Sequence, residues 1–519
     1  MADVVLGIDI GTTGVKALAA GWDGAVHALC RRGVTHRFPE PGYAEQDPFE
    51  LAEAVAHVVR AAAAQARADG HRLRALSFSS VMHGIFAVDE ANRPLTAMMT
   101  WADTRAAQQA DALRAAFPDL YERTGVPMHP MLPAAKLRWL RDAWPGFQQA
   151  ARFVSFKQWL LAEWCGRHVE DRATAGATGL LNLRTLRWDA ELLAAAGVRE
   201  PQLGQLVPCT TQMTVSSGQW LQHLGLPEPL PVVVGATDGL LATVGSGVFG
   251  PRMYSVTAGT SGAVRKMTPG VALDPQARTF SYILDADHWV AGGATNNAGL
   301  ALSWLAAQIG VPAGGGGGDG VMGVFSVAQS VPAGADGLLF LPYLAGERAP
   351  HWNERARGVL FGLDVRHSRA HMLRAGIEGV AFALRSIHDL LSVPPDMGSV
   401  PSRDAGQWDA GQLSSSGAGA VVRASGGLFY SPLWCQLVAD VLATPVEVTE
   451  QEEVSGAGAA HWGFFALGEH RRLEDVQSCV RVRTRFEPQE ERVRIYAEQF
   501  GRFQEVYRRL EPCFGGRDG

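Results

Sequence analysis

A Gly-Thr turn that follows a β-rich segment occurs twice in this sequence. The stretch LGIDIGTTGVKA (residues 6–17) runs an apolar segment into Gly11–Gly14, and SVTAGTSGAV (residues 255–264) does the same at Gly259–Gly262, about half the chain later. Glycine lets the backbone turn tightly and approach a ligand closely, and successive N–H groups in such a turn can surround phosphate oxygens. Either turn alone could be an ordinary hairpin. The repeat predicts a duplicated unit whose two turns together hold a polyphosphate.

Predicted strands alternate with predicted helices along the chain, which indicates an α/β fold. The strand-like runs include VVLGIDIG, RALSFSSVM, LPVVVGATDG, RMYSVTAGT, HWVAGGAT and GLLFLPYLAG, and Ala- and Leu-rich stretches such as FELAEAVAHVVRAAAAQA lie between them. Because 519 residues exceed what one hydrophobic core usually covers, we expect two domains with a cleft between them. The strand pattern restarts near Pro251, so we predict domains at residues 1–247 and 248–519.

Three further segments have a recognisable composition. The tail from about Glu490 carries apolar residues at helical spacing, which predicts a C-terminal helix packed on the second domain. The segments 312–320 and 394–420 are rich in Gly, Ser and Pro, and we expect both to be loops.

Charge and cysteine usage exclude several classes of protein. The net charge is −6, and the 46 basic and 52 acidic residues form no basic stripe, so nucleic acid is not an expected partner. The six cysteines are scattered without a CxxC pair, which indicates neither a disulfide framework nor a zinc site. No apolar run reaches the roughly 18 residues that a membrane span needs. We therefore expect a soluble, cytoplasmic protein without membrane association.

Other nucleotide-binding motifs do not fit the sequence. There is no GxxxxGK[ST]. The GSGVFG stretch (245–250) follows a helical segment and leads into a strand, which is the reverse of the order in a dinucleotide-binding fold. Asp238, in VVVGATDGLLA, ends an apolar strand and begins a helix, which is where α/β proteins place reactive groups. From its position alone it could equally be a helix cap.

From end to end the chain resembles the FGGY family of carbohydrate kinases. The motifs that carry the resemblance are, in chain order, GIDIGTTGVK, MHG (82–84), TWADTR (100–105), GATDG (235–239), TAGTSG, LPYLAGERAPHW (341–352) and ASGGLFYSPLWCQLVADVL (424–442). The resemblance implies two domains of the ribonuclease H-like, actin-type ATPase fold. It also implies a kinase that holds the sugar mainly with the first domain and ATP mainly with the second.

The resemblance further implies roles for individual residues. Asp238 would be the general base that takes a proton from the attacking sugar hydroxyl, and Asp9 would orient Mg²⁺ through water. The residues implied to hold ATP are Gly11, Thr12, Thr13, Lys16, Gly259, Thr260, Gly299, Ser303, Gly426, Gly427 and Ser431. The residues implied to contact the substrate are His83, Gly84, Trp101, Asp103 and Arg105. Structural interpretations stay open for Trp101, as a core residue, and for Arg105, as the partner of a carboxylate.

The motifs differ in the substrate that they favour. TWADTR, ATGLLNLRTLRWD (177–189) and GERAPHWNERARG (346–358) look most similar to the gluconokinase branch, which favours D-gluconate as substrate and 6-phosphogluconate as product. MHG is the spelling of xylulokinases, so D-xylulose stays open. The carboxylate of gluconate needs a cationic or strongly donating partner, for which His83, Arg105 and Lys157 are the candidates. The family also suggests a homodimer.

Two other classes of function share part of this pattern. A non-catalytic, sugar-responsive binding protein would be expected to lose Asp238 or a phosphate turn, and this chain keeps both. An actin-like ATPase acting in assembly or chaperoning would share the Gly-Thr turns but not MHG, TWADTR and GERAP. The sequence therefore favours a sugar kinase over both.

Overall fold

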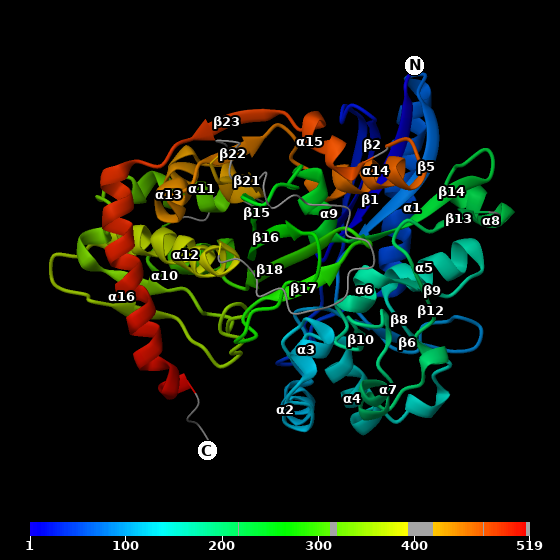
Figure 1. The fold of residues 1–519 in the computed structure, drawn as a ribbon, viewed down its shortest axis with the longest axis horizontal. Helices are drawn as coiled ribbons and strands as arrows, with labels where there is room; N and C mark the ends of the chain where they lie inside the picture. The colour runs from blue at the N-terminus through cyan, green and yellow to red at the C-terminus, as the bar shows by residue number, and fades with distance from the viewer. Residues whose placement is uncertain (216, 312–318, 393–418, 471, 515–519) are drawn as a thin grey trace.

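Two mixed β-sheets, one in each half of the chain, organise the molecule (Figure 1). The computed structural model describes residues 1–215, 217–311, 319–392, 419–470 and 472–514. The segments predicted to be loops at 312–320 and 394–420 fall almost entirely outside these ranges. None of the described helices is long and apolar enough to cross a membrane.

The first sheet has six strands in the order β13-β14-β5-β1-β2-β3. Its central strand β1 pairs antiparallel with β2 and parallel with β5, and β5 pairs parallel with β14. The strands are β1 (Asp3–Ile10), β2 (Gly14–Gly21), β3 (Val26–Gly33), β5 (Arg72–Ser80), β13 (Gln212–Val215) and β14 (Leu230–Thr237).

The second sheet has seven strands in the order β17-β18-β16-β15-β21-β22-β23. Its strands are β15 (Met253–Ala258), β16 (Gly262–Thr268), β17 (Phe280–Ile283), β18 (Trp289–Thr295), β21 (Val421–Ser425), β22 (Val446–Thr449) and β23 (Val482–Phe486). Strands β18-β16-β15-β21-β22-β23 repeat the order and the relative directions of β3-β2-β1-β5-β14-β13. The β1–β2 and β15–β16 hairpins, which carry the two Gly-Thr turns, therefore occupy the same place in their sheets.

Helix α1 (Pro48–Ala68) shows how the sequence specifies the helices of the first half. Asp47 caps it by accepting the backbone N–H groups of Phe49 and Glu50, and Pro48 suits the first turn because it lacks an N–H group.

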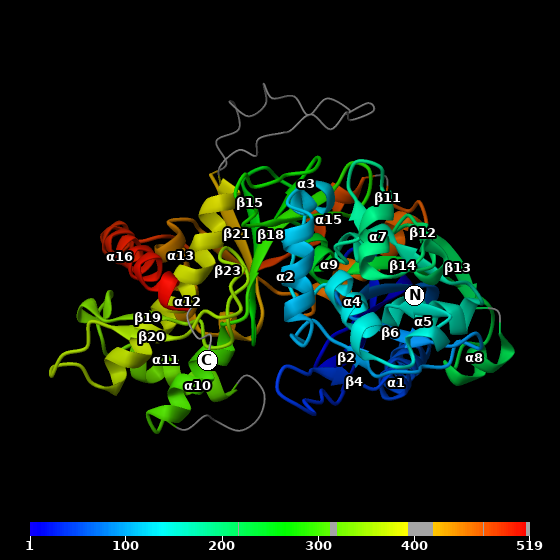
Figure 2. The same ribbon diagram turned by 90° about the horizontal axis from the view of Figure 1, so that it is seen from below.

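Helices α2, α3, α4 and α7 gather at one end of this half (Figures 1 and 2). The remaining helices are α2 (Ala107–Ala116), α3 (Leu120–Thr124), α4 (Pro133–Ala143), α5 (Phe156–Cys165), α6 (Arg172–Gly176), α7 (Ala190–Ala196), α8 (Gly218–His223) and α9 (Asp238–Gly245). The short strands are β4 (Glu45–Gln46), β6 (Phe86–Val88), β7 (Met98–Met99), β8 (Arg152–Val154), β9 (Val169–Asp171), β10 (Leu181–Asn182), β11 (Arg187–Trp188) and β12 (Gln205–Val207).

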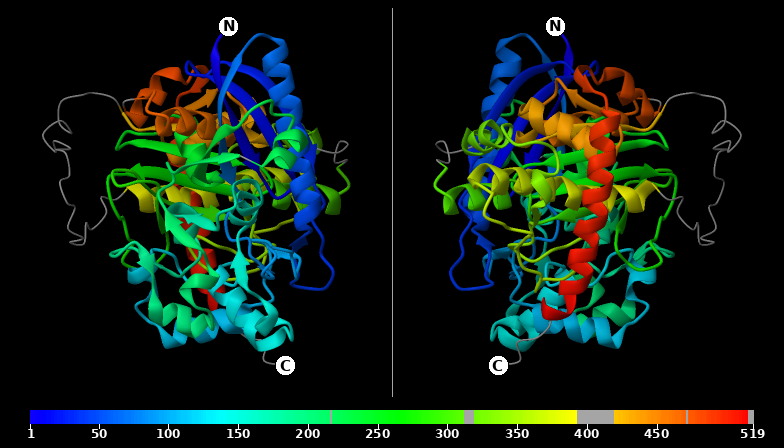
Figure 3. Two further views of the ribbon diagram at one scale, coloured as in Figure 1. Left: turned by 90° about the vertical axis from the view of Figure 1, so that its right-hand side faces the viewer. Right: turned by 90° about the vertical axis from the view of Figure 1, so that its left-hand side faces the viewer.

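The predicted C-terminal helix is confirmed as α16 (Glu490–Phe514), which runs along the outer side of the second half (Figure 3). Tyr496, Phe500, Phe503 and Tyr507 are buried on it and join the hydrophobic core of that half. The other elements are α10 (Gly299–Gln308), α11 (Asp319–Ala328), α12 (Arg369–Ser392), α13 (Pro432–Leu442), α14 (Val454–Ala466), α15 (Val476–Cys479), β19 (Leu339–Leu341) and β20 (Val359–Phe361).

Helix α14 belongs to the second half by sequence but packs on the first sheet, against β1 and α9 (Figure 1). The backbones of α9 and α14 touch at two glycines. A Cβ atom on Gly245 would lie 2.0 Å from the carbonyl oxygen of Val454, and one on Gly458 would lie 1.8 Å from that of Leu241. A cut at residue 247 would separate the two sheets, but it would also remove α14 from the sheet that it covers.

Candidate active site

The first Gly-Thr turn is flanked by opposite charges. Asp9 on β1 lies directly across the hairpin from Lys16 on β2, and the Gly11 N–H group donates to the carbonyl of Gly14 at 3.0 Å to close the turn. The Thr12 hydroxyl accepts a hydrogen bond from the indole N–H of Trp101 at 2.8 Å. This bond ties the predicted phosphate turn to the predicted sugar segment.

The second Gly-Thr turn is supported by the start of α10. The Gly259 N–H group donates to Ser261 at 2.9 Å, and the Gly299 N–H group donates to the carbonyl of Gly259 at 2.8 Å. Gly299 must be glycine for this approach, because a Cβ atom there would lie 2.7 Å from the same carbonyl oxygen. Thr260 accepts the N–H group of Leu300, so the turn and the helix form one unit. Ser303 lies one turn further along α10 and is half-buried.

A pocket of about 170 Å³ between the halves brings Lys16 together with Gly426 and Gly427. In it the Lys16 ammonium group lies 2.6 Å from a carboxylate oxygen of Glu453, which also pairs with Arg31 at 2.8 Å. Lys16 of the first half is thus held by a carboxylate of the second half. A triphosphate entering this pocket would compete with that carboxylate.

Three residues that line this pocket were not predicted from the sequence. They are Glu453, the aromatic Tyr430 and, from β23, Arg483. Ser431, one of the residues implied to hold ATP, caps α13: its hydroxyl accepts the Trp434 N–H group at 3.4 Å, and its side chain is buried.

Asp238 is the first residue of α9 and directly follows strand β14. Its carboxylate accepts the N–H group of Gly239 at 2.8 Å, and Thr237 occupies the cap position. Burial raises the pKa of Asp238 above its ordinary value, and the charges of Arg265 and Arg348 oppose that rise. Asp238 is therefore a partly desolvated carboxylate facing two cations, which suits a group that must accept a proton.

Asp9 and Asp238 lie close enough to repel each other. Burial raises the pKa of Asp9 to about 6, and the charge of Asp238 adds to the rise while Lys16 opposes it. A hydrogen bond from the Ser79 hydroxyl, 2.8 Å long, fixes the Asp9 side chain. Within the described residues no three His, Cys, Asp or Glu side chains converge as a metal site. A pair of mutually repelling carboxylates nevertheless suits Mg²⁺, which usually binds one or two carboxylates, several waters and phosphate oxygens.

A buried lysine contacts the backbone of the predicted sugar-binding segment around His83. Lys136 on α4 donates to the carbonyl of His83 at 2.8 Å and to that of Thr100 at 2.6 Å, so it joins the MHG and TWADTR motifs. Burial lowers the pKa of Lys136 to about 7. The His83 Nδ1 atom lies 2.7 Å from the carbonyl oxygen of Ala177, and burial, with the charge of Lys136 second, lowers the pKa of His83 to about 3. His83 is thus a neutral imidazole. Sequence analysis missed Lys136, since its partners are backbone carbonyls distant in the chain.

Asp103 and Arg105 satisfy each other. Asp103 is fully buried and accepts hydrogen bonds from the Ala44 N–H group and from the Arg105 guanidinium group. Arg105 also pairs with Glu45 at 2.5 Å, and its guanidinium carbon lies 3.5 Å from the centre of the Tyr43 ring. Both residues therefore fix the shape of the TWADTR segment. The contacts of Arg105 agree with the interpretation that it is the partner of a carboxylate.

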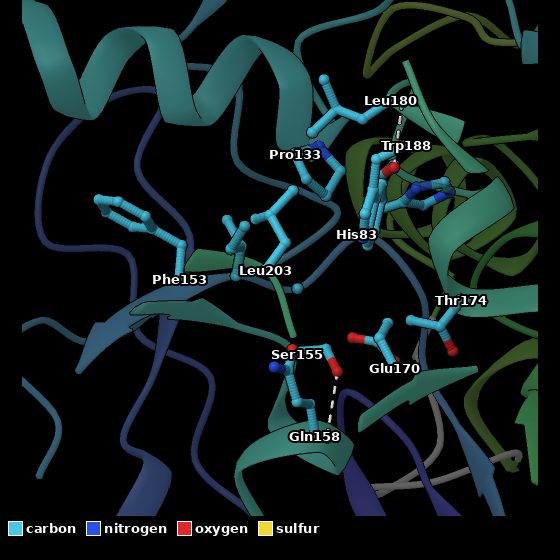
Figure 4. A pocket seen from close by; sticks show the side chains of 13 residues that line it. His83, Pro133, Phe153, Ser155, Gln158, Glu170, Thr174, Leu180, Trp188 and Leu203 are labelled. Carbon is cyan, nitrogen blue, oxygen red and sulfur yellow. Dashed lines mark hydrogen bonds between the residues drawn. The ribbon is translucent and has the colours of Figure 1, made fainter. Parts of the chain in front are cut away.

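The prediction that Lys157 could meet a substrate carboxylate is wrong. Its side chain is completely buried, and its ammonium group lies 2.6 Å from Asp171. Beside this ion pair and behind the sugar segment lies a cavity of about 20 Å³, which has room for about one water molecule. Ser155, Gln158, Glu170 and Thr174 form its polar side, opposite apolar residues that include Phe153 and Leu203 (Figure 4).

Two arginines of the second half were also missed by sequence analysis. Arg265, on β16, lies against the start of α9, where a Cβ atom on Gly239 would be 2.8 Å from its Nε atom. The guanidinium carbon of Arg348 lies 5.0 Å from the centre of the Trp101 ring. Arg348 belongs to the GERAP motif, which supported the resemblance, but only the fold brings it to the TWADTR segment and Asp238.

Comparison with known proteins gives matches along nearly the whole chain. Residues 4–245 match the N-terminal domain of the FGGY family of carbohydrate kinases, and residues 254–467 match the C-terminal domain. The gluconokinase of Bacillus licheniformis is 34% identical over 525 residues, covering 98% of this chain and 97% of that protein.

Solved structures share the same architecture. The crystal structure of gluconate kinase from Lactobacillus acidophilus aligns with a TM-score of 0.87 at 28% identity and covers 99% of each chain. The ligand-bound crystal structure of xylulose kinase from the same organism gives the same TM-score, identity and coverage. These similarities extend across both sheets and therefore include the cleft between them.

Proposed function

The chain belongs to the FGGY family of carbohydrate kinases and is a kinase of a small sugar, and from this premise we propose that it transfers the γ-phosphoryl group of ATP to D-gluconate. The acceptor is the terminal hydroxyl of gluconate, and the products are 6-phosphogluconate and ADP. The full-length similarity to gluconokinase supports this choice of acceptor.

The observation that carries the choice of a sugar acid is the positive charge around Asp238. Arg265 and Arg348 lie near Asp238, and burial lowers the pKa of both guanidinium groups. Desolvated cations are costly unless an anion meets them. An anionic acceptor and the phosphates of ATP would supply that charge.

Asp238 acts as the general base. The attacking hydroxyl gives its proton to the Asp238 carboxylate as its oxygen bonds to the γ-phosphorus, while the bond from that phosphorus to the β-phosphate oxygen breaks and ADP leaves. The Gly239 N–H group and Arg265 hold the carboxylate in its ionised form before transfer. Because the protein mainly positions the reactants and neutralises charge in such a reaction, closure of the cleft that excludes water also limits hydrolysis of ATP.

The nucleotide lies across both halves. The N–H groups of Thr12, Thr13 and Thr260 bind phosphate oxygens, since those of Gly11 and Gly259 close the turns, and Lys16 exchanges Glu453 for a phosphate when ATP enters. Mg²⁺, held by Asp9 through water, would neutralise charge on the phosphates. Gly426 and Gly427 leave room for the adenosine, and Tyr430 lies at the edge of the same pocket.

A second candidate acceptor is D-xylulose. The xylulose kinase structure aligns as well as the gluconate kinase structure does, and the MHG motif around His83 has the xylulokinase spelling. D-Xylulose lacks a carboxylate, so the two buried arginines near Asp238 favour gluconate over it.

The experiment that tests the proposal measures ADP release with ATP and Mg²⁺ in the presence of gluconate, xylulose, ribulose or glycerol. We expect kcat/KM for gluconate to exceed that for each other acceptor by at least about tenfold, the discrimination that one charge-assisted hydrogen bond supplies. A higher value for xylulose would replace gluconate by the second candidate. No ADP release with any acceptor would contradict kinase activity on these sugars.

A further inference from the structure

The loop that carries Arg348 is fixed by hydrogen bonds to the end of β18. The loop connects β19 and β20, and its preceding residue Glu347 is buried and accepts hydrogen bonds from the Thr295 hydroxyl at 2.6 Å and the Asn296 N–H group at 3.1 Å. Asn297 donates to the carbonyl of Gly346 at 2.7 Å from the same strand end. These contacts fasten the loop to the end of β18, so the Arg348 side chain projects from a fixed backbone.

The guanidinium group of Arg348 has a donor without a partner among the described residues. The hydrogen bond recorded for its side chain within the described residues runs from Nη2 to the carbonyl of Thr295, at 3.2 Å. Its Nε atom is buried and has no partner among the described residues. Burial lowers the pKa of Arg348 to about 10, which leaves the group charged near neutrality. Arg348 is therefore a cation with unused donors, and a planar carboxylate fits such a fork.

The surroundings of Arg348 place it on the sugar side of the cleft. Its guanidinium group lies over the ring of Trp101, 5.0 Å from the ring centre, and its charge acts on His83, His129 and Asp238. Both histidines are neutral, because burial lowers the pKa of each to about 3. Among the cations near the sugar segment, Lys136 is occupied by backbone carbonyls and Arg105 by two carboxylates.

We propose that Arg348 is the specificity-determining residue that binds the carboxylate of a sugar-acid substrate, with Trp101 forming the wall along which the carbon chain lies. This proposal rests on the proposed function and adds the group that separates a sugar acid from a neutral sugar. One end of the substrate is then held by Arg348 of the second half while its terminal hydroxyl faces Asp238 of the first. Binding of the carboxylate thereby joins the two halves across the acceptor.

The test compares two ligands that differ at one end. D-Gluconate carries a carboxylate where the neutral polyol D-glucitol carries a hydroxymethyl group. Their dissociation constants are measured by calorimetry, without nucleotide, for the wild type and for Arg348→Met, Arg348→Lys and Arg355→Met. Methionine keeps the apolar contact with Trp101, and Arg355 is an exposed residue of the same loop that serves as the matched control.

We expect Arg348→Met to weaken gluconate binding by about 10- to 100-fold, the size of a charge-assisted pair, and to change glucitol binding by less than about threefold. Arg348→Lys should retain part of the gluconate affinity, since it keeps the charge but loses the planar fork. Arg355→Met should match the wild type. Thermal melting of each variant checks that it is folded, and Arg348→Lys provides the comparison if the methionine variant is not.

Three outcomes would overturn the proposal. Equal losses for gluconate and glucitol would mean that Arg348 only shapes the site. Unchanged gluconate binding by Arg348→Met would show that Arg348 does not bind the carboxylate. A wild type that binds gluconate no better than glucitol, and phosphorylates xylulose, would overturn the proposed substrate and this inference with it.

Discussion

The two Gly-Thr turns have the same place in their sheets but different surroundings. Asp9 lies two residues before the first glycine of the first turn, and Lys16 lies five residues after it. The residues at the same distances from Gly259 in the second turn are Thr257 and Val264. The first turn thus lies between two charges. The second has no charge at these two positions, although Arg265 on β16 donates to the Thr257 hydroxyl at 3.2 Å. It rests on the start of α10 through the bond between Gly299 and Gly259.

The repeated hairpins share their backbone geometry, whereas the charged side chains around them differ between the two halves. Both hairpins supply backbone N–H groups, which bind phosphate irrespective of the side chains nearby. The two carboxylates that repel each other, Asp9 and Asp238, belong to the first half, while the second half contributes two cations, Arg265 and Arg348, which face Asp238. We therefore propose that proton transfer and metal binding belong to the first half.

The largest effect is expected from Asp238→Asn. Because only a carboxylate accepts the proton while the amide keeps its size, we expect kcat to fall by about 10²- to 10⁴-fold. The dissociation constant of ATP, measured by calorimetry, should change little. A variant that loses ATP binding together with turnover would show that Asp238 holds the nucleotide site instead of acting as the base.

A paired substitution at the matching positions of the two turns tests the comparison directly. Asp9→Asn should lower kcat/KM by about 10- to 100-fold at limiting Mg²⁺, the usual cost of losing a group that orients a metal through its waters. Thr257→Ser, which keeps the hydroxyl that accepts from Arg265 at 3.2 Å, should stay within about threefold of the wild type, as expected of a position without charge. Titrations of activity against Mg²⁺ measure both. Equal losses for the two variants would contradict a division of roles between the turns.

Asp9→Asn should also stabilise the ligand-free protein at alkaline pH. The pKa of Asp9 is raised from 3.8 to about 6, so its contribution to stability is fully present below 3.8 and is lost as the pH rises through about 6. At about pH 8 the free energy of unfolding of the variant should exceed that of the wild type by about 1 to 3 kcal/mol. The lower end of this range applies because Asp9 keeps some contact with solvent. Denaturant unfolding at several pH values measures this. A difference that does not shrink between about pH 6 and pH 4 would contradict the assignment to Asp9.

The smallest effect is expected at the contact between Lys16 and Glu453. Glu453→Gln removes the carboxylate that competes with phosphate for Lys16, so ATP should bind about two- to fivefold more tightly, as expected for a partly exposed ion pair. Glu450→Gln, which alters an exposed carboxylate of the same segment that does not line the pocket, is the matched control and should change nothing. Weaker ATP binding by Glu453→Gln would show that Glu453 orients Lys16 for the nucleotide.

Local patterns in the sequence predicted the elements of the fold well. The runs around β1, β5, β14, β15 and β18 form strands, and the apolar spacing after Glu490 forms α16, because period and turn residues act over short distances. Full-length motif matches identified the family, and the comparisons confirm it.

The electrostatics of the site could not be predicted in the same way. The partners of Lys136, Arg348 and Glu453 lie tens to hundreds of residues away, and no local pattern shows which charges will meet. Lys157 was chosen for its charge alone, but only the packed structure shows that Asp171 already satisfies it.

At the crossing of α9 and α14, Gly245 and Gly458 leave no space for a side chain, and α14 covers apolar residues of the first sheet such as Val5, Leu18 and Ala75. The halves repeat one strand order, yet they are not interchangeable modules. A gene fragment that encodes only the first half would produce a sheet with a bare apolar face, and such faces aggregate. The chain must therefore be synthesised to beyond Phe464 before its first half can be completed, which makes the two halves a single unit of folding and of inheritance.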